Sequence, residues 1–245
     1  MNPKMKIART VLGVIGNITS GALFLSPVPT FRRIWKNKST LEYHPYPYLA
    51  GVLNCIFWVL YSMPFVHPHS TLITTINSFG LFLYLCYLAM FFYYTDPKIP
   101  AKSKDRLKVV VFLILELIFA GAISAVTKIA FHNPESRTKF VGSVCVVFGI
   151  ILYGSPLSVM RKIIKTKSAE FMPFWISLAG FSNGIVWSAY AFLPLDFFVL
   201  TGNGIGALLS TIQLILQCMY RNTTPKNKTK PSEVQLQIDA NKTPV

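Results

Sequence analysis

The chain has 245 residues, of which 52% are hydrophobic and only 13% are charged, and its formal net charge is +15. A soluble domain of this length would carry about twice that charged fraction, so the composition excludes an ordinary soluble protein. The basic residues lie between apolar stretches, without a stacking platform or a groove-reading motif, and nucleic-acid binding is therefore not indicated. Long apolar stretches with short basic connectors predict a polytopic helical membrane protein.

Seven stretches are apolar and long enough to cross a membrane as helices, which takes about 20 residues each. In chain order they are 8–31, 46–65, 70–94, 107–131, 140–160, 174–193 and 197–220. The first stretch meets Pro27 and Pro29 instead of a small-residue cleavage site, so we interpret it as a membrane helix and not as a signal peptide. The polar segment 221–245 is expected to be a disordered cytosolic tail.

Basic residues alternate along the connectors between these stretches. The first, third and fifth connectors and the tail are rich in Lys and Arg, whereas the second and sixth contain neither. The fourth connector has two basic residues, and Glu135 offsets part of their charge. By the positive-inside rule, the basic connectors and the tail are cytosolic and the N-terminus lies outside. Lys4, Lys6 and Arg9 argue weakly against this orientation, but the other loops together outweigh them. The same basic ends are expected to contact anionic membrane lipid.

The chain contains an internal repeat. Residues 26–61 return 129 positions later as residues 155–190, and 14 of the 36 positions are identical. The matched pairs include residues that shared hydrophobicity does not explain: Ser26/Ser155, Pro27/Pro156, Lys36/Lys165, Lys38/Lys167, Ser39/Ser168, Asn54/Asn183, Trp58/Trp187 and Tyr61/Tyr190. Asn77 and Gly80 return at an offset of 126 as Asn203 and Gly206.

The repeat predicts the fold class, because a duplicated unit constrains the architecture more than any local propensity. We expect an all-α membrane protein with seven transmembrane helices in a 3+1+3 arrangement. Two three-helix repeats, 8–94 and 140–220, are joined by a linker helix, 107–131. Because each repeat has an odd number of spans, the single linker helix makes the two repeats parallel.

Prolines mark candidate hinges. A proline removes a backbone hydrogen bond and clashes with the preceding helical turn, so it kinks or loosens a helix. Pro27 and Pro156 stand at matched positions and are predicted to be a hinge pair. Pro47 and Pro173 miss the offset of 129 by three positions, which is nearly one helical turn. They are candidates for an equivalent pair. Prolines at helix ends are the alternative interpretation.

Polar and aromatic residues inside the spans predict a ligand site. Asn77 and Asn203 are amides that we expect to face the interior of the bundle, where they suit a neutral polyhydroxyl ligand, with interhelical hydrogen bonding as the alternative. Asn54 and Asn183 form a second matched pair. One turn beyond that pair, on the same helix face, lie Trp58 and Trp187, which could stack on a sugar ring or anchor the helix at the membrane interface. Three residues further along, Tyr61 and Tyr190 are placed to narrow the outer mouth.

Other chemistry is not supported by the sequence. All four cysteines lie inside apolar stretches without metal-ligand spacing, so we expect no metal, no disulfide and no cofactor. Glu116 and Asp196 are isolated, no catalytic set is present, and an acidic proton relay is missing. An enzyme is therefore not expected, and uncoupled facilitation is favoured over proton symport.

These features together resemble the plant SWEET sugar transporters. The residues that carry the resemblance are the Ser-Pro-Val-Pro-Thr-Phe stretch 26–31, the two Lys-x-Lys-Ser loops, stretches 155–161 and 170–174, and the two Asn-containing stretches in the third and seventh spans. The resemblance covers about residues 7–220. It implies parallel three-helix repeats, an arrangement already known for the SWEETs. It also implies bidirectional, uncoupled sugar movement by alternating access.

The resemblance also implies roles for individual residues. The sugar contacts are Asn77, Asn203, Trp58 and Trp187, and the secondary pocket positions are Ser20, Leu23, Asn54, Gly149, Leu152 and Asn183. The proline tetrad is Pro27, Pro47, Pro156 and Pro173. Tyr61 and Asp196 fall at the extracellular gate, where the repeat also places Tyr190. Gly149 stands at the position that matches Ser20, so a symmetric polar contact there is not expected.

The resemblance extends to the hexose-preferring branch through stretches 53–58 and 63–70. Asn54 and Asn183 are larger than the small residues typical of sucrose-preferring members. We therefore expect hexoses such as glucose, with a sucrose-preferring or proton-coupled sugar transporter as the alternative. A channel and a seven-helix receptor are the rival classes, and a receptor would not carry the repeat. The plasma membrane is the expected location, with the vacuolar membrane as the alternative, and the expected partner is a second copy in a homo-oligomer.

Overall fold

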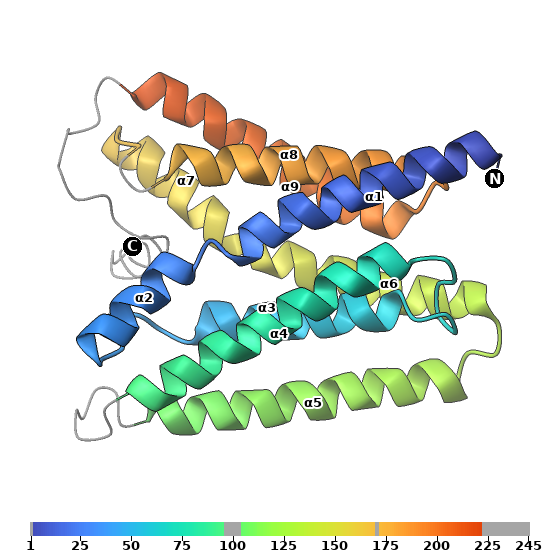
Figure 1. Cartoon of the computed structure of the whole chain (residues 1–245), viewed down its shortest axis with the longest axis horizontal. Helices are drawn as coiled ribbons and strands as arrows, with labels where there is room; N and C mark the ends of the chain where they lie inside the picture. Colours follow the sequence, from blue (N-terminus) through green and yellow to red (C-terminus); the bar gives the residue numbers. More distant parts are fainter. Residues whose placement is uncertain (1, 96–103, 170–171, 222–245) are drawn as a thin grey trace. The chain divides into compact units, whose positions relative to one another are not determined.

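The structure is a computed structural model that describes residues 2–95, 104–169 and 172–221. Within these residues the chain folds into nine α-helices (Figure 1). They are α1 (Pro3–Phe24), α2 (Val28–Asn37), α3 (Tyr46–Tyr61), α4 (Thr71–Tyr94), α5 (Asp105–Ile129), α6 (Pro134–Leu152), α7 (Gly154–Thr166), α8 (Phe174–Phe192) and α9 (Phe197–Tyr220). The predicted tail from residue 222 onward, part of the third connector and the Glu170–Phe171 pair lie outside the described residues.

The nine helices correspond to the seven predicted spans because the first and fifth spans are each broken once. Helix α1 ends at Phe24 and α2 begins at Val28, whereas α6 and α7 are separated at Tyr153. Five segments are long and apolar enough to cross a membrane: 3–37, 71–94, 105–129, 134–166 and 197–220. Helix α3 is a shorter apolar helix, which ends four residues before the predicted Phe65. The all-helical fold class is confirmed.

The helix bounds carry the same duplication as the sequence. Helices α4 and α9 begin 126 positions apart and also end 126 positions apart. Helices α2 and α7 end 129 positions apart, at Asn37 and Thr166. The next residue in each case, Lys38 or Lys167, has a positive φ of 51° or 52°. Such a left-handed residue is a common way to end a helix, and it is usually glycine. The two repeats therefore share even their strained turns.

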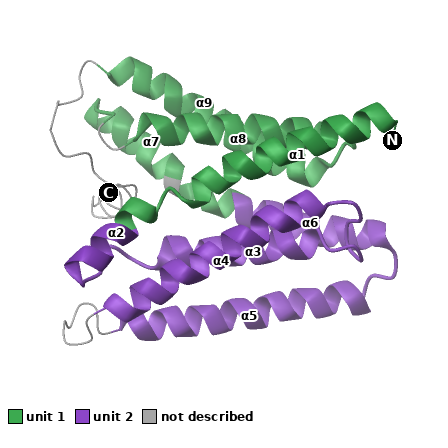
Figure 2. Cartoon of the chain, viewed as in Figure 1, with its two compact units in different colours: residues 1–30, 150–245 green, residues 31–149 purple. Residues whose placement is uncertain are grey.

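The helices gather into two compact units (Figure 2). Unit 1 comprises residues 1–30 and 150–245, and unit 2 comprises residues 31–149. Thus α1 packs against α8 in unit 1, and α6 belongs with α3, α4 and α5 in unit 2. The compact units group the helices differently from the order of the sequence repeats. The chain passes between the units at residues 30–31 and 149–150, and each passage lies close to a helix break.

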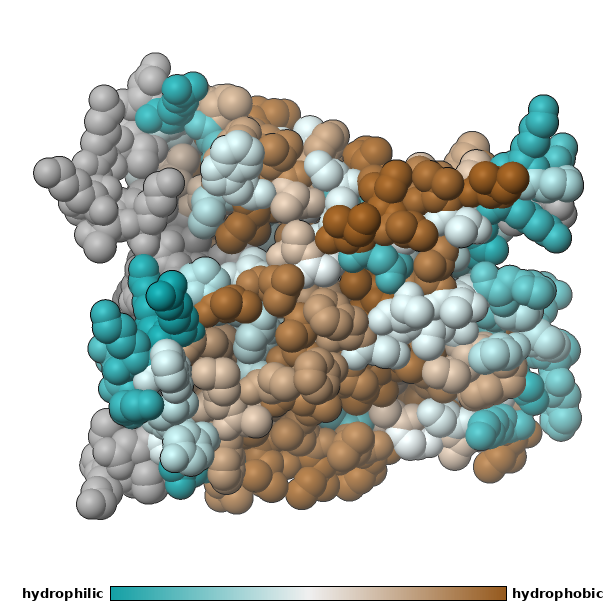
Figure 3. Space-filling model, viewed as in Figure 1, coloured by the Kyte–Doolittle hydropathy of each residue, from teal (hydrophilic) through white to brown (hydrophobic). Residues whose placement is uncertain are grey.

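The outward-facing side chains are those of a membrane protein. Hydrophobic side chains cover the middle of the helices and hydrophilic ones gather at the helix ends (Figure 3). On α5, side chains such as Leu107, Leu117 and Ile118 are more than half exposed. Exposed apolar side chains of this extent are unfavourable in water and favourable against lipid tails. The long apolar spans predicted from composition are therefore present as helices with apolar outer faces.

Candidate functional site

A cavity of about 380 Å³ lies within unit 1. Its volume falls within the range of about 300–1,000 Å³ that is usual for small-molecule sites. Helices α7, α8 and α9 supply most of its lining. The residues that line it are Leu23, Tyr153, Pro156, Val159, Met172, Pro173, Ile176, Ser177, Gly180, Asn183, Gly184, Asn203, Gly206, Leu209, Ser210 and Gln213. All of them are uncharged, so the cavity offers hydrogen bonds and apolar contacts to a neutral molecule.

Asn183 of α8 reaches this cavity while two hydroxyl groups of α1 hold its side chain. Thr19 Oγ1 donates to Asn183 Oδ1 at 2.8 Å, and Ser20 Oγ donates to the same oxygen at 2.7 Å. Because both hydroxyls occupy the amide oxygen, Asn183 has its amide N–H groups to offer a ligand. Ser20 was predicted as a pocket position, whereas Thr19 was missed because it has no polar match in the other repeat.

Trp187 of α8 is fixed by the same part of α1. Its indole Nε1 donates to Ser20 Oγ at 2.9 Å, and the side chain is only 5% exposed. The ring lies so close to Gly16 that a Cβ at that residue would be 2.8 Å from a ring carbon. Gly16 therefore permits the approach. In this conformation, the ring that the sequence placed against a sugar packs on the backbone of α1, and it orients Ser20 toward Asn183.

Asn203 lines the cavity from α9. Its side-chain amide donates to the Val199 carbonyl at 2.9 Å, and in unit 2 Asn77 donates to the Ile73 carbonyl at 2.9 Å. The two bonds match at the offset of 126, so each bond fixes the side chain on its own helix in the same way. Each amide has a second N–H group and a carbonyl oxygen in addition to that bond. Near Asn203, the Tyr153 hydroxyl donates to the Gly202 carbonyl. This bond ties the break between α6 and α7 to α9.

The four prolines all lie at helix starts. Pro27 immediately precedes α2, and Pro47 lies in the first turn of α3. Pro156 lies in the first turn of α7, Pro173 is the N-cap of α8, and both line the cavity. Proline is tolerated at a helix start because the missing N–H would have no intrahelical partner there. The expected disruption is therefore a break between two helices and not a kink inside one, and the hinge role itself stays a prediction.

The far end of α8 in unit 1 carries a charged and aromatic group. The guanidinium carbon of Arg9 lies 4.6 Å from the centre of the Tyr190 ring, and that ring meets Trp187 edge-on at 5.1 Å. Asp196 is 6% exposed and accepts a hydrogen bond from the Val199 N–H at 3.2 Å, which caps α9. The sequence pointed to Tyr190 and Asp196, but it treated Arg9 only as a topology signal.

The corresponding end of unit 2 is organised around Tyr61, which is fully buried. Its ring stacks on His67 at 4.9 Å and meets Trp58 edge-on at 5.5 Å. His67 Nδ1 lies 2.5 Å from Ser70 Oγ, at the start of α4. The sequence missed His67 because a histidine in a short loop carries no signal of the ring that it stacks against.

The remaining predicted positions are distributed between the two units. Asn54, Trp58 and Asn77 are half-buried in unit 2, where Gly149 also lies. Leu152 is half-buried at the last residue of α6. Of the predicted residues, the cavity of unit 1 brings together five: Leu23, Asn183, Asn203, Pro156 and Pro173.

Acidic and metal-binding chemistry is sparse around the cavity. Within the described residues, no three His, Cys, Asp or Glu side chains come together as metal ligands. Glu116 is buried on α5 of unit 2, and one of its carboxylate oxygens has no hydrogen-bond partner in the described part of the chain. The cavity itself therefore depends on amides and hydroxyls.

Duplicated membrane helices, with an uncharged cavity enclosed within one compact unit, are typical of a polytopic membrane transporter for small molecules. Comparison with known proteins identifies the family. The profile described as "Sugar efflux transporter for intercellular exchange" matches residues 10–99 and 139–225. The chain is 47% identical to bidirectional sugar transporter SWEET4 of Arabidopsis thaliana over 221 residues, which cover 90% of this chain and 86% of that protein. It is 43% identical to SWEET7b of Oryza sativa subsp. indica over 93% of this chain and 84% of that protein.

A solved structure of a eukaryotic SWEET transporter matches with a TM-score of 0.83 and 37% identity, covering 89% of this chain and 99% of that one. The chain therefore belongs to the SWEET family, a family of transporters and not of enzymes. The sequence-based recognition of the family and of its 3+1+3 fold is confirmed. The two stretches matched by the family profile leave residues 100–138, which include the predicted linker helix, between them.

Proposed function

We propose that this chain moves sugars across a membrane in both directions without coupling to an ion, and that hexoses such as glucose are its preferred substrates. The observation that carries the proposal is the uncharged cavity of unit 1, into which Asn183 and Asn203 bring amide groups from two neighbouring helices. Amides can donate to and accept from the hydroxyl groups of a sugar. The relatives in the family, several of them named bidirectional sugar transporters, support the same function.

Alternating access is the mechanism that we propose for this transport. The two helix breaks lie beside Pro27 and Pro156, and the chain passes between the compact units close to both breaks. At each break the regular helical ladder gives way to turn bonds, such as those from the Ser26 N–H to the Leu23 carbonyl and from the Tyr153 N–H to the Ile150 carbonyl. Such a break is a place where a helix pair can change its angle at low cost. The prolines at the starts of α3 and α8 would let those helices follow. A channel would need no such paired breaks.

The proposed topology puts the N-terminus outside and the basic connectors in the cytosol, with the plasma membrane as the location. The Lys38 and Lys167 turns then face the cytosol, and Tyr61, Tyr190 and Asp196 lie toward the outside as candidates for the extracellular gate. We propose that Arg9 belongs to this outer group because its guanidinium lies on the Tyr190 ring. A cation over an aromatic face contributes about 0.5–2 kcal/mol, enough to bias a closed state.

The hexose preference rests on the space beside Asn183. Leu23 and Asn183 both line the cavity, and the hydrogen bonds from α1 hold the amide in place. Because these hydrogen bonds hold the Asn183 side chain in one orientation, it cannot easily move aside to make room for a disaccharide. In unit 2, the matched Asn54 is also larger than the small residues expected of a sucrose-preferring relative.

Uptake of radiolabelled glucose and sucrose by yeast without hexose transporters tests the substrate. We expect strong glucose uptake, weak sucrose uptake, and accelerated counterflow when unlabelled glucose is present on the far side. Uptake that does not saturate would indicate a channel, and uptake abolished by a protonophore would indicate proton coupling. Strong sucrose uptake without hexose uptake would contradict the preference.

The variant Asn203→Ala tests the role of the cavity. Removing the amide deletes hydrogen bonds to the sugar worth about 0.5–1.5 kcal/mol each, so glucose uptake should fall about tenfold. Surface expression must be measured alongside uptake. Normal uptake at normal surface expression would remove Asn203 from the mechanism.

A further inference from the structure

The two repeats fill the matched part of their interiors with different residues. In unit 2, three aromatic rings that are at most 5% exposed pack together. Phe31 stacks on Tyr87 at 4.5 Å, and Tyr48 meets Phe31 at 4.9 Å and Tyr87 at 5.8 Å. Tyr84 adds a fourth ring, 6.4 Å from Tyr87. Aromatic rings at these separations make a dense, well-packed core.

In unit 1, the positions that match these rings carry smaller or more flexible side chains. At the offset of 129, Phe31 corresponds to Met160 and Tyr48 to Ser177. At the offset of 126, Tyr84 corresponds to Ser210 and Tyr87 to Gln213. Three of these four residues, Ser177, Ser210 and Gln213, line the cavity. The cavity thus reaches into space that aromatic rings occupy in the other repeat.

One glycine contact shows that these positions also match in space. A Cβ at Gly51 would lie 2.5 Å from the ring of Tyr84, and a Cβ at Gly180 would lie 2.8 Å from Ser210 Oγ. Gly51 and Gly180 are themselves 129 positions apart. The same helix-to-helix contact therefore ends in a ring in unit 2 and in a hydroxyl group in unit 1, so the difference between the interiors is a difference in side chains.

One face of α9 lines this part of the cavity and carries three polar side chains, those of Asn203, Ser210 and Gln213. Asn203, Gly206, Ser210 and Gln213 follow one another at spacings of three or four residues and so share one face of α9. At 1.5 Å per residue, Ser210 lies about 10 Å and Gln213 about 15 Å along the helix from Asn203. A single hexose ring is shorter than this distance, so a hexose bound at Asn203 cannot also bind Gln213.

A buried amide next to this part of the cavity has an unused acceptor. Gln217 of α9 is 7% exposed, and its Nε2 donates to the Ser177 hydroxyl, which lines the cavity, at 2.9 Å. Its Oε1 has no hydrogen-bond partner among the described residues. Gln217 itself does not line the cavity, but its bond occupies an acceptor site of the Ser177 oxygen and leaves the Ser177 proton to be donated to a hydroxyl group of a molecule in the cavity.

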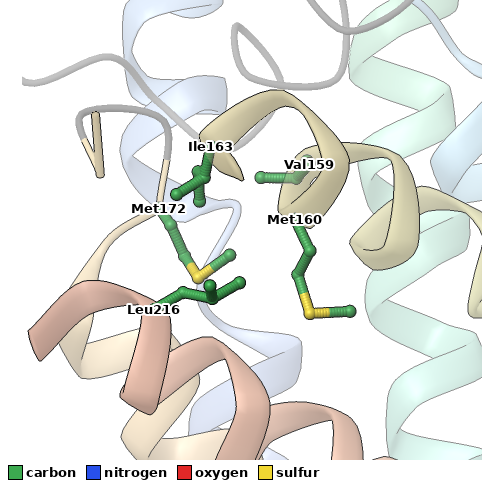
Figure 4. Packing of buried hydrophobic residues seen from close by; sticks show 5 residues of the cluster. All are labelled: Val159, Met160, Ile163, Met172 and Leu216. Carbon is green, nitrogen blue, oxygen red and sulfur yellow. The ribbon is translucent and has the colours of Figure 1, made fainter. Parts of the chain in front are cut away.

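The floor of this end is apolar and adaptable. Val159 and Met172 line the cavity and belong to a buried cluster with Met160, Ile163 and Leu216 (Figure 4). The cluster joins α7 to the start of α8 and to the last turns of α9. Methionine side chains are flexible and polarizable, so they can adjust to the apolar face of a sugar ring without a fixed shape.

We propose that Ser177, Ser210 and Gln213 form a second binding subsite for a neutral polyhydroxyl molecule, separate from the contacts at Asn183 and Asn203. The subsite rests on the proposed function, because it takes the same sugar at another point of its path. The sugar moves between Asn203 and the Met172 end of the cavity by exchanging one set of hydroxyl-binding groups for the next.

A cysteine reporter at Leu209 tests the subsite without removing any of its polar groups. Leu209 lines the cavity between Asn203 and Gln213. In Leu209→Cys protein, labelling of the introduced thiol by a small thiol reagent is followed by mass spectrometry, with increasing glucose. We expect glucose to protect this thiol when Asn203→Ala is also present. The change Ser210→Ala with Gln213→Leu should raise the glucose concentration for half protection about threefold to tenfold per hydrogen bond lost.

The matched residue of the other repeat supplies a gain-of-volume variant and a control. Ser210→Tyr introduces the side chain that unit 2 carries at Tyr84, so it should fill the subsite and abolish protection and glucose uptake. Tyr84→Phe, in the aromatic interior of unit 2, should leave protection unchanged. Protection that vanishes with Asn203→Ala alone, or that persists at full strength in Ser210→Tyr, would overturn the subsite. If the unmodified chain still takes up glucose in that case, the proposed function stands and only the subsite is refuted. If the unmodified chain takes up no glucose, the subsite and the proposed function are both refuted.

Discussion

In unit 1, the Asn183 amide and the Trp187 indole are both bonded to α1, whereas in unit 2 the matched Asn54 and Trp58 are half-buried and the position that matches Ser20 is Gly149. A Cβ built at Gly149 meets no described atom within 4 Å. The Asn-x-x-x-Trp pattern is thus identical in the two repeats, but its partners are not. Identical residues in a duplicated chain can therefore be fixed in one copy and adaptable in the other.

The difference matters for how firmly each unit would orient a bound ligand. A side chain with two fixed hydrogen bonds keeps one orientation, which favours a ligand of matching shape. A side chain without such partners can follow the ligand at an entropic cost. We infer that the second repeat supplies the oriented contacts. The variants below either remove this difference or enlarge it.

The largest effect is expected where α1 touches the Trp187 ring. Gly16→Leu places a side chain where a Cβ alone would be 2.8 Å from the ring. Overpacking of this kind costs about 1–3 kcal/mol, and here it also separates Ser20 from the indole. We expect glucose uptake at background level and a lower melting temperature of the purified protein.

The same helix offers a matched control for this variant. Gly21 also lies on α1, and a Cβ built there meets no described atom within 4 Å. Gly21→Leu should therefore melt close to the unmodified protein, with the same change of residue type. If Gly16→Leu and Gly21→Leu behave alike, the position of the Trp187 ring has no functional weight.

A smaller effect is expected when the hydroxyl that joins Trp187 to Asn183 is removed. Ser20→Ala leaves the buried indole N–H without its partner and removes one of the two donors to Asn183, at a cost of about 1–3 kcal/mol. Unit 1 then resembles unit 2, where Gly149 provides no hydroxyl. Glucose uptake should fall several-fold, mainly through a higher KM, because Asn183 loses its fixed orientation.

Thr10→Ala controls for the loss of a hydroxyl from α1. The Thr10 hydroxyl donates to the Lys6 carbonyl of its own helix and lies at the exposed end. Uptake by Thr10→Ala should stay near that of the unmodified chain. A KM that does not change in Ser20→Ala, at normal surface expression, would show that Asn183 needs no support from α1.

The sequence predicted the features that identity between the repeats reveals. The matched Pro27 and Pro156 were predicted to be hinges, and they lie beside the two helix breaks, while Leu23, Asn183 and Asn203 line the cavity. The matched positions share their local structure because a duplicated segment folds under the same local rules twice, whereas the roles of these residues as hinges and sugar contacts stay predictions. The repeat could not show that α1 packs against α8, because a choice of partner between distant helices depends on the whole interior and not on local pattern.

What the sequence could not supply lies mostly at positions where the repeats differ. The repeat does not single out Tyr84 and Ser210 because they do not match, yet the cavity of unit 1 is lined by Ser210 where unit 2 carries the Tyr84 ring. Gly16 lies 171 positions before Trp187, and no local pattern links a glycine to a distant ring. Arg9 carried a charge that argued about topology, whereas its guanidinium lies on Tyr190. Mismatches in a duplicated chain are therefore as informative as matches once the structure places them.

The smallest effect is expected at the caps of the two matched helices α4 and α9. Asp196 and Ser70 are 126 positions apart and both are N-caps, but only Asp196 accepts a side-chain hydrogen bond from its helix, from the Val199 N–H. The Ser70 hydroxyl is bonded to His67 instead.

Asp196→Ala should therefore cost about 1 kcal/mol of stability, and Asp196→Asn should cost less because asparagine is also a good N-cap. Ser70→Ala should leave the start of α4 less affected, as judged by amide hydrogen exchange in the first turn of each helix. If Asp196→Asn instead lowers glucose uptake as much as Asp196→Ala while both proteins keep their melting temperature, then Asp196 acts through its charge at the outer gate, and its role as a cap is secondary.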